Sequence, residues 1–211
     1  MLGGVVPAGG ASRRMDGVDK LSLEVGGRTL LDRVLAAAGA VCDRLVVVGP
    51  TRPTAVPNVT FAVEAVPGGG PVPAVAAGLD LLDDADVVLV LAADLPLLTG
   101  AALRMLLDAL VDDEEEAAAA RDHQGRPNPL LAAYAANRLR VRSAGLGPGT
   151  PAAALLPAVT ALVDLGPEAT LNVNGPEDLE RARALVEGRG VRAGGRGTPP
   201  GGRSPARRRE P

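Results

Sequence analysis

The sequence predicts an α/β fold built in layers around a mostly parallel β-sheet. Short apolar runs that end near glycine or proline alternate with longer segments in which apolar residues recur at helical spacing. The run Val87–Ala92 is apolar throughout, which is typical of a strand at the centre of a sheet with both faces covered. Alternating strands and helices favour a parallel sheet, because the helices serve as crossovers between its strands.

The apolar runs give the expected strands in chain order. They are Leu2–Val6, Arg44–Val48, Thr60–Val63, Val87–Ala92, Ala117–Ala120, Leu130–Tyr134 and Val159–Leu165.

Helices are expected between these runs, and several carry start signals. Thr29 and Thr99 can each cap a helix, because their hydroxyl oxygens accept hydrogen bonds from the first free backbone N–H groups. Thr150-Pro151 indicates a short helix with proline in its first turn. The other expected helices are Val72 to Leu82 and, roughly, Pro176 to Glu187.

The composition narrows the class of protein. The chain has 211 residues and is 46% hydrophobic, enough for one domain with a substantial core. Aromatic residues make up only 1%, which argues against a protein that stacks nucleic-acid bases on aromatic rings. The single cysteine, Cys42, excludes an intramolecular disulfide. No signal peptide and no apolar run of about 18 residues is present, so we expect a soluble cytoplasmic protein without membrane contact.

The charge is unevenly distributed along the chain. The net charge is −3, but from Gly188 onward there are seven arginines and one glutamate among glycines and prolines. Such a segment buries too little apolar surface to offset the entropy lost on ordering. We expect one domain over residues 1–187 and a disordered basic tail over residues 188–211.

The most informative feature is Lys20, the only lysine among 22 basic Lys+Arg residues. It closes the turn that begins with Pro7-Ala8-Gly9-Gly10 after the first expected strand and contains Arg13-Arg14. Glycines let backbone N–H groups approach an anion, and a lysine is a flexible point charge. A glycine turn of this kind can be purely structural, but the added positive charges favour a phosphate-binding site.

Asp94 follows the expected central strand in the segment Ala92–Pro96. In parallel sheets ligands bind beyond the carboxyl ends of the strands, so Asp94 and the Lys20 loop are expected at the same edge. A single carboxylate beside phosphates is a natural ligand for magnesium, which completes its shell with water and phosphate oxygens. The alternative is an aspartate that only forms a turn before Pro96.

Two further segments permit either a structural or a ligand-binding interpretation. Gly68–Pro71 is a turn before a helix, or a place where backbone N–H groups meet a ligand. Asn172 and Asn174 are alternate residues of an extended segment, so both amides can face one cleft. The alternative is that these asparagines are structural residues at a strand end and at a helix cap.

Taken in order, five segments resemble the motifs of the MobA-like nucleotidyltransferases, in particular the molybdenum cofactor guanylyltransferases. They are Pro7–Lys20, Gly69-Gly70-Pro71 with Leu79 downstream, Ala92–Pro96, Asn128–Tyr134 and Asn172–Leu179. The resemblance covers residues 1 to about 187. It implies a three-layer α/β/α, Rossmann-like nucleotidyltransferase fold.

The resemblance also implies roles for individual residues. The catalytic residues would be Lys20, Arg14 and Asp94, with Lys20 and Arg14 on the triphosphate and Asp94 on Mg²⁺. Asn174 would be the second metal ligand, with Asn172 nearby. Further nucleotide-binding positions would be Pro7, Ala8, Gly9, Gly10, Ser12, Arg13, Gly49, Ala65 and Gly70.

The implied reaction transfers a nucleoside monophosphate from an NTP to a phosphorylated acceptor and releases pyrophosphate. GTP and a molybdopterin-like acceptor are favoured, with no specific nucleic-acid partner and a monomer as one possibility. Three departures weaken the choice of base and acceptor. The Pro7-Ala8 start of the first loop is similar to that of the cytidylyltransferases of isoprenoid synthesis. Gly49 and Ala65 stand where the family has polar residues, and Ala74 stands where it has a glycine. A CTP-using enzyme, another acceptor and a non-catalytic nucleotide-binding protein therefore stay as alternatives.

Overall fold

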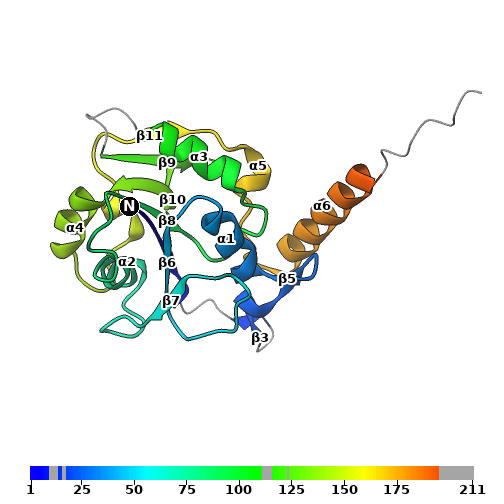
Figure 1. Cartoon of the computed structure of the whole chain (residues 1–211), viewed down its shortest axis with the longest axis horizontal. Helices are drawn as coiled ribbons and strands as arrows, with labels where there is room; N and C mark the ends of the chain where they lie inside the picture. Colours follow the sequence, from blue (N-terminus) through cyan, green and yellow to red (C-terminus); the bar gives the residue numbers. More distant parts are fainter. Residues whose placement is uncertain (10–13, 16–17, 111–115, 123, 195–211) are drawn as a thin grey trace, which may run out of the picture.

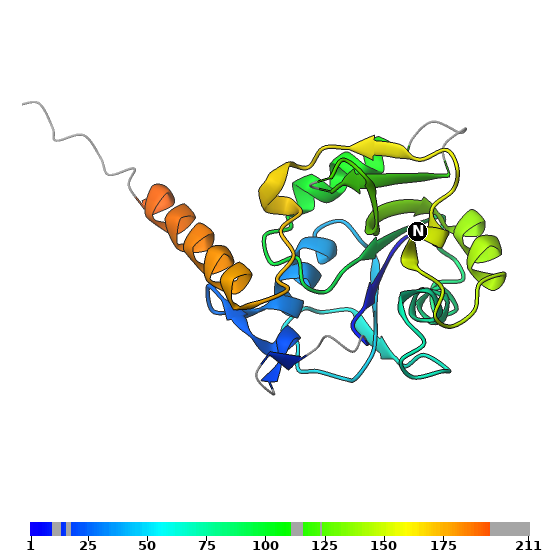
Figure 2. The ribbon, with the colours of Figure 1, turned by 180° about the vertical axis from the view of Figure 1, so that it is seen from behind.

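A computed structural model of the chain describes residues 1–9, 14–15, 18–110, 116–122 and 124–194. In this part of the chain a seven-stranded sheet lies between two layers of helices (Figure 1). Helix α6 (Pro176–Gly194) extends away from this body, as the view from behind also shows (Figure 2). The expected three-layer α/β/α fold is confirmed.

The sheet has the order β11-β9-β10-β8-β1-β6-β7. Its strands are β1 (Leu2–Pro7), β6 (Arg44–Val48), β7 (Val59–Ala62), β8 (Val87–Leu91), β9 (Ala117–Arg121), β10 (Pro127–Ala135) and β11 (Ala161–Val163). Strands β7, β6, β1 and β8 are mutually parallel, and only β10 runs antiparallel to its neighbours β8 and β9. The sheet is therefore mostly parallel, and β8 occupies its centre as predicted.

Helices form where the capping residues indicated. Oγ1 of Thr29 accepts a hydrogen bond from the Asp32 backbone N–H at 3.0 Å at the start of α1 (Leu30–Gly39). Oγ1 of Thr99 accepts one from the Ala102 N–H at 3.2 Å at the start of α3 (Gly100–Asp108). The remaining helices before α6 are α2 (Pro71–Leu79), α4 (Ala136–Ala144) and α5 (Gly166–Ala169).

Several expectations differ from the structure. The helix expected after Thr150-Pro151 is only the 3₁₀ turn η2 (Ala152–Leu155), and Pro151 flanks it without a capping side chain. Helix α4 was not predicted from the sequence. Helix α6 runs to Gly194, past the boundary expected at residue 187, so the structure has helix over residues 188–194, where disorder was expected. The rest of the expected tail lies outside the described residues.

Short elements between β1 and α1 were also not predicted. They are β2 (Arg14–Met15), β3 (Val18–Asp19), η1 (Lys20–Ser22), β4 (Glu24–Val25) and β5 (Arg28–Thr29). Strands β2 and β3 form one antiparallel ribbon, and β4 and β5 form another. These ribbons place Lys20 directly after β3.

The core is divided by the sheet into two layers. Along β1, Val6 belongs to the cluster under α1 and α3, whereas its neighbour Val5 belongs to the cluster under α2 and α4. Successive strand residues point to opposite faces, so an all-apolar strand such as β8 contributes to both clusters. A third, smaller cluster joins the first turns of α6, through Leu179 and Ala182, to Val25 and Val173.

None of the helices in the described ranges combines the length and the apolar character that a membrane span requires.

Glycine 78 allows α2 to pack closely on β1. A Cβ at this position would lie 2.5 Å from Cγ1 of Val5, which is fully buried. We predict that Gly78→Ala lowers the free energy of unfolding by about 1–3 kcal/mol through overpacking. Urea denaturation measures the change. Gly188→Ala is the matched control: a Cβ there meets nothing within 4 Å, and alanine favours helix by up to about 1 kcal/mol. Equal effects of the two substitutions would contradict this account of the α2–β1 contact.

Candidate active site

The loops that follow β1, β6 and β7 lie side by side at the carboxyl edge of the sheet. The Ala8 N–H donates to the carbonyl oxygen of Val48 at 2.8 Å, and the Gly49 N–H donates to that of Ala62 at 2.8 Å. These bonds continue the parallel ladder past the strand ends. Pro7, Ala8, Gly9 and Gly49 thus meet at one edge.

The backbone of Gly49 approaches that of Ala8 too closely for a side chain at position 49. A Cβ at Gly49 would lie 2.7 Å from the carbonyl carbon of Ala8. A Cβ at Gly9 would lie 3.4 Å from Oε1 of Glu64. Glycine at position 49 is therefore a packing requirement, because the backbone of Ala8 occupies the place of a side chain.

Lys20 forms an ion pair with Asp94 at this edge. The Lys20 residue is 5% exposed, and its Nζ lies 2.6 Å from Oδ2 of Asp94. The sequence predicted that the two lie at the same edge, with Lys20 on the triphosphate and Asp94 on Mg²⁺. In the structure they touch directly, so this arrangement leaves no room for a phosphate between the two charged groups.

The turn that carries Lys20 is held in place by Asp19 and Arg52. Oδ1 of Asp19 accepts from the Leu21 N–H at 3.1 Å and caps η1. Nε of Arg52 donates to Oδ2 of Asp19 at 2.6 Å, and its Nη1 donates to the carbonyl oxygens of Pro50 at 3.1 Å and Ala8 at 3.4 Å. Arg52 therefore ties the loop after β6 to the Lys20 turn and to the loop after β1. Sequence reasoning missed it, although it follows the Gly49-Pro50 turn at the same sheet edge.

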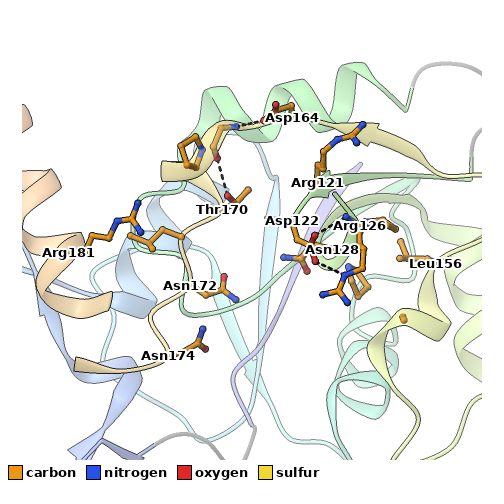
Figure 3. A pocket seen from close by; sticks show the side chains of 16 residues that line it. Arg121, Asp122, Arg126, Asn128, Leu156, Asp164, Thr170, Asn172, Asn174 and Arg181 are labelled. Carbon is orange, nitrogen blue, oxygen red and sulfur yellow. Dashed lines mark hydrogen bonds and ion pairs between the residues drawn. The ribbon is translucent and has the colours of Figure 1, made fainter. Parts of the chain in front are cut away.

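The extended segment Asn172–Asn174 lies beside Asp94. The Val173 N–H donates to the carbonyl oxygen of Asp94 at 3.0 Å, and the Val173 side chain is fully buried in the third core cluster. Alternation then turns Asn172 and Asn174 to the opposite side, toward the space beside the β9–β10 hairpin (Figure 3). Capping of α6 falls to Asp178, whose Oδ2 accepts from the N–H groups of Asn174 at 2.8 Å and Gly175 at 3.1 Å. The asparagine side chains are therefore not needed as caps for that helix.

Two oxygen atoms in this region are buried without a hydrogen-bond partner in the described part of the chain. They are Oδ1 of Asp94 and Oδ1 of Asn172. An unpaired buried acceptor is costly and calls for a ligand. The described residues contain no group of three or more His, Cys, Asp or Glu side chains that could hold a metal. One carboxylate and one amide oxygen nevertheless fit Mg²⁺, which takes oxygen ligands and keeps water or phosphate in its remaining positions.

The other predicted nucleotide-binding positions are only partly accounted for. Gly70 flanks α2 without a capping side chain, and Ala65 is exposed in the loop after β7. Gly10, Ser12 and Arg13 lie outside the described residues. Arg14 is described only as a backbone position in β2.

A cavity of about 1020 Å³ opens on the far side of Asn172 and Asn174. It lies between the β9–β10 hairpin and the segment that leads from β11 to α6 (Figure 3). Arg121 and Arg181 line it and form no ion pair within the described ranges. Arg126 is paired with Asp122, and a hydrogen bond from the Arg126 backbone N–H lowers the pKa of that carboxyl group. Asp164 also lines the cavity, so its three arginines and two aspartates leave the lining with a net charge of +1, which favours an anionic ligand. The sequence showed no sign of it, because its arginines come from segments far apart in the chain.

Comparison with known proteins identifies the family of the chain. The family model of the MobA-like NTP transferase domain matches residues 4–156. A protein of Chloroflexus aggregans named probable molybdenum cofactor guanylyltransferase is 32% identical over 211 residues, covering 88% of this chain and 95% of the relative.

Two solved structures show the same fold. Molybdopterin-guanine dinucleotide biosynthesis protein A from Archaeoglobus fulgidus superposes with a TM-score of 0.64 at 20% identity, covering 88% of this chain and 99% of the other. The 4-diphosphocytidyl-2C-methyl-D-erythritol synthase from Anaerococcus prevotii gives 0.65 at 15% identity, covering 88% and 96%.

The fold, the site and these relatives define the chain as a nucleotidyltransferase. It belongs to the MobA-like NTP transferase family.

The Lys20–Asp94 pair makes a testable contribution to stability. We predict that Lys20→Met lowers the free energy of unfolding by about 3 kcal/mol, because it leaves the Asp94 carboxylate largely buried without its cation. Adding Asp94→Asn to that variant recovers part of the loss, because it removes the uncompensated charge. Urea denaturation in EDTA, without nucleotide, measures both. Additive losses from Lys20→Met and Asp94→Asn would show that the two side chains are not coupled.

Proposed function

We propose that this nucleotidyltransferase is magnesium-dependent and transfers GMP from GTP to the phosphate of a molybdopterin-like acceptor, with release of pyrophosphate. The supporting observation is the Lys20–Asp94 pair with the unpaired oxygens of Asp94 and Asn172 beside it. This group lies between the glycine loops after β1 and β6 and the arginine-lined cavity. Donor and acceptor could therefore approach it from opposite sides.

The reaction forms one bond and breaks one. An oxygen of the acceptor phosphate attacks the α-phosphorus, and the bond from that phosphorus to the β-phosphate oxygen breaks as pyrophosphate leaves. The reaction requires little covalent participation by protein side chains, because positioning and charge stabilisation supply most of the acceleration. Lys20 would move from Asp94 to the phosphates and stabilise negative charge on them. Arg14 is assigned to the same phosphates by the family resemblance.

The metal would be held by Asp94, by Asn172 through its buried Oδ1, and by Asn174 on the same face of the segment. Mg²⁺ supplies positive charge that offsets the charge developing on the phosphate oxygens. Asp94 would then exchange its contact with Lys20 for one with the metal, and both of its oxygens would have partners.

The acceptor would occupy the cavity lined by Arg121 and Arg181. Cavities of about 300–1,000 Å³ hold drug-sized ligands, so this one has room for a pterin with its phosphate. The choice of molybdopterin and of GTP rests on the names of the relatives. The fold alone does not indicate which base the enzyme binds, because a 4-diphosphocytidyl-2C-methyl-D-erythritol synthase has the same fold.

The assigned chemistry predicts a loss of turnover without a loss of fold. Lys20→Ala and Asp94→Ala are expected to lower kcat at least about 100-fold, by analogy with removal of one charge-stabilising group from an active site. Pyrophosphate release in the presence of GTP, Mg²⁺ and molybdopterin measures it. Circular dichroism confirms that each variant is folded at the assay temperature. Asp83→Asn, at the opposite end of the sheet, is the control. Undiminished activity of either alanine variant would contradict its assigned role.

The cavity makes a separate prediction about the acceptor. Arg181→Ala is expected to raise KM for the acceptor about tenfold, the cost of a hydrogen bond to a charged group, and to leave KM for GTP unchanged. Arg183→Ala is the matched control on the same helix, because Arg183 is paired with Glu180 and does not line the cavity. A parallel rise in KM for GTP, or no change at all, would exclude the cavity as the acceptor site.

A further inference from the structure

Glu64 is a buried acidic residue whose charge the architecture of the loop does not explain. It lies just past the carboxyl end of β7 and is 8% exposed. The other buried polar side chains in the described ranges are Lys20 and Ser143, which pair with Asp94 and the Arg140 carbonyl oxygen. Glu64 has no cation partner among the described residues.

The hydrogen bond that the Glu64 side chain accepts within the described ranges could also be accepted by a neutral residue. Its Oε1 accepts from the Gly68 N–H at 2.7 Å, which closes the loop after β7. A glutamine would accept the same hydrogen bond without the cost of burying a charge. Oε2 is not among the buried unpaired atoms and has no partner in the described ranges, so it is open to a ligand.

The surroundings of Glu64 are the glycines assigned to the nucleotide. Its Oε1 lies 3.4 Å from the place of a Gly9 Cβ, and that Cβ would lie 3.8 Å from Cα of Gly49. A base lying on the backbone of Ala8 and Gly9 would therefore have the Glu64 carboxylate at its edge. Ala65, the neighbouring residue, offers only a methyl group.

An acceptor-only group discriminates among the four bases. Guanine alone presents two adjacent donors, N1–H and the N2 amino group, which match the two oxygens of a carboxylate. Adenine and cytosine each place a ring acceptor beside their amino donor, and uracil places two carbonyl oxygens around its single N–H. We propose that Glu64 is the residue that selects guanine, by accepting hydrogen bonds from N1–H and N2–H₂. This inference rests on the proposed function, in which the base lies over the loop after β1.

The opposing explanation is that Glu64 only fixes its loop, and Glu64→Gln separates the two. Glutamine keeps an acceptor for the Gly68 N–H, so the loop is preserved. Its amide N–H₂ would oppose a guanine donor but would pair with O2 of xanthine, while its oxygen accepts from xanthine N1–H. The substitution therefore predicts a change of preference from GTP to XTP.

The experiment is calorimetric titration of GTP, ITP, XTP, CTP and ATP with Mg²⁺ into the full-length protein, the Glu64→Gln variant and the Asp83→Asn control. The original protein should bind GTP about 10- to 100-fold more tightly than CTP or ATP, and ITP more weakly than GTP because it lacks the amino group. Glu64→Gln should bind XTP more tightly than GTP. Inorganic tripolyphosphate, which has no base, should bind all three proteins equally.

The outcomes also separate this inference from the proposed function. Retention of the GTP preference in Glu64→Gln, or equal binding of GTP and CTP by the original protein, would overturn the role of Glu64 while leaving transferase activity intact. Selective GTP binding without turnover on molybdopterin would support Glu64 and contradict the proposed reaction. If no nucleotide bound to the protein, both the role of Glu64 and the proposed function would be contradicted.

Discussion

The site depends on one interaction, the ion pair between Lys20 and Asp94. It joins two loops that are 74 residues apart in the chain and brings together a buried cation and a mostly buried anion. Removing either partner would leave the other charge buried and uncompensated, which costs about 3 kcal/mol. The contacts around the pair fix its two halves: Asp19 and Arg52 hold the turn of Lys20, and the Val173 N–H holds the backbone of Asp94. The arrangement of the loops is therefore set by electrostatics as much as by apolar packing.

Much of the fold and part of this site could be predicted from the sequence, because the signals are local. Strands such as β6 and β8 are uninterrupted apolar runs, and Thr29 and Thr99 cap helices with their own hydroxyl groups. In a parallel sheet the carboxyl ends of the strands meet at one edge, so the sequence alone could place Lys20 and Asp94 together there. The direct contact between them could not be foreseen, since it depends on a two-residue ribbon too short to show periodicity.

What the sequence did not reveal depends on contacts between distant segments. Helix α4 carries Arg138, Arg140 and Arg142 among few apolar residues, and its position is decided by packing against α2 and β10. The reversal of β10 follows from pairing with β8 and β9 and has no local signature. In the sequence, Arg52 and Glu64 are charged loop residues without any special signal. In the structure, they lie next to Ala8 and Gly9 at the carboxyl edge of the sheet.

The same geometry explains why a lysine stands here in a chain that otherwise uses arginine. Under the proposed function, the group that pairs with Asp94 must also release it, since phosphates and a metal would compete for both members of the pair. An arginine could hold the carboxylate with two parallel hydrogen bonds in a fixed plane, which makes such an exchange harder. A lysine makes one contact at the end of a flexible stem, at 2.6 Å in this structure, and can turn toward a phosphate without moving its backbone. The bias toward arginine elsewhere in the composition is general, whereas the proposed function requires at position 20 a cation that changes partners.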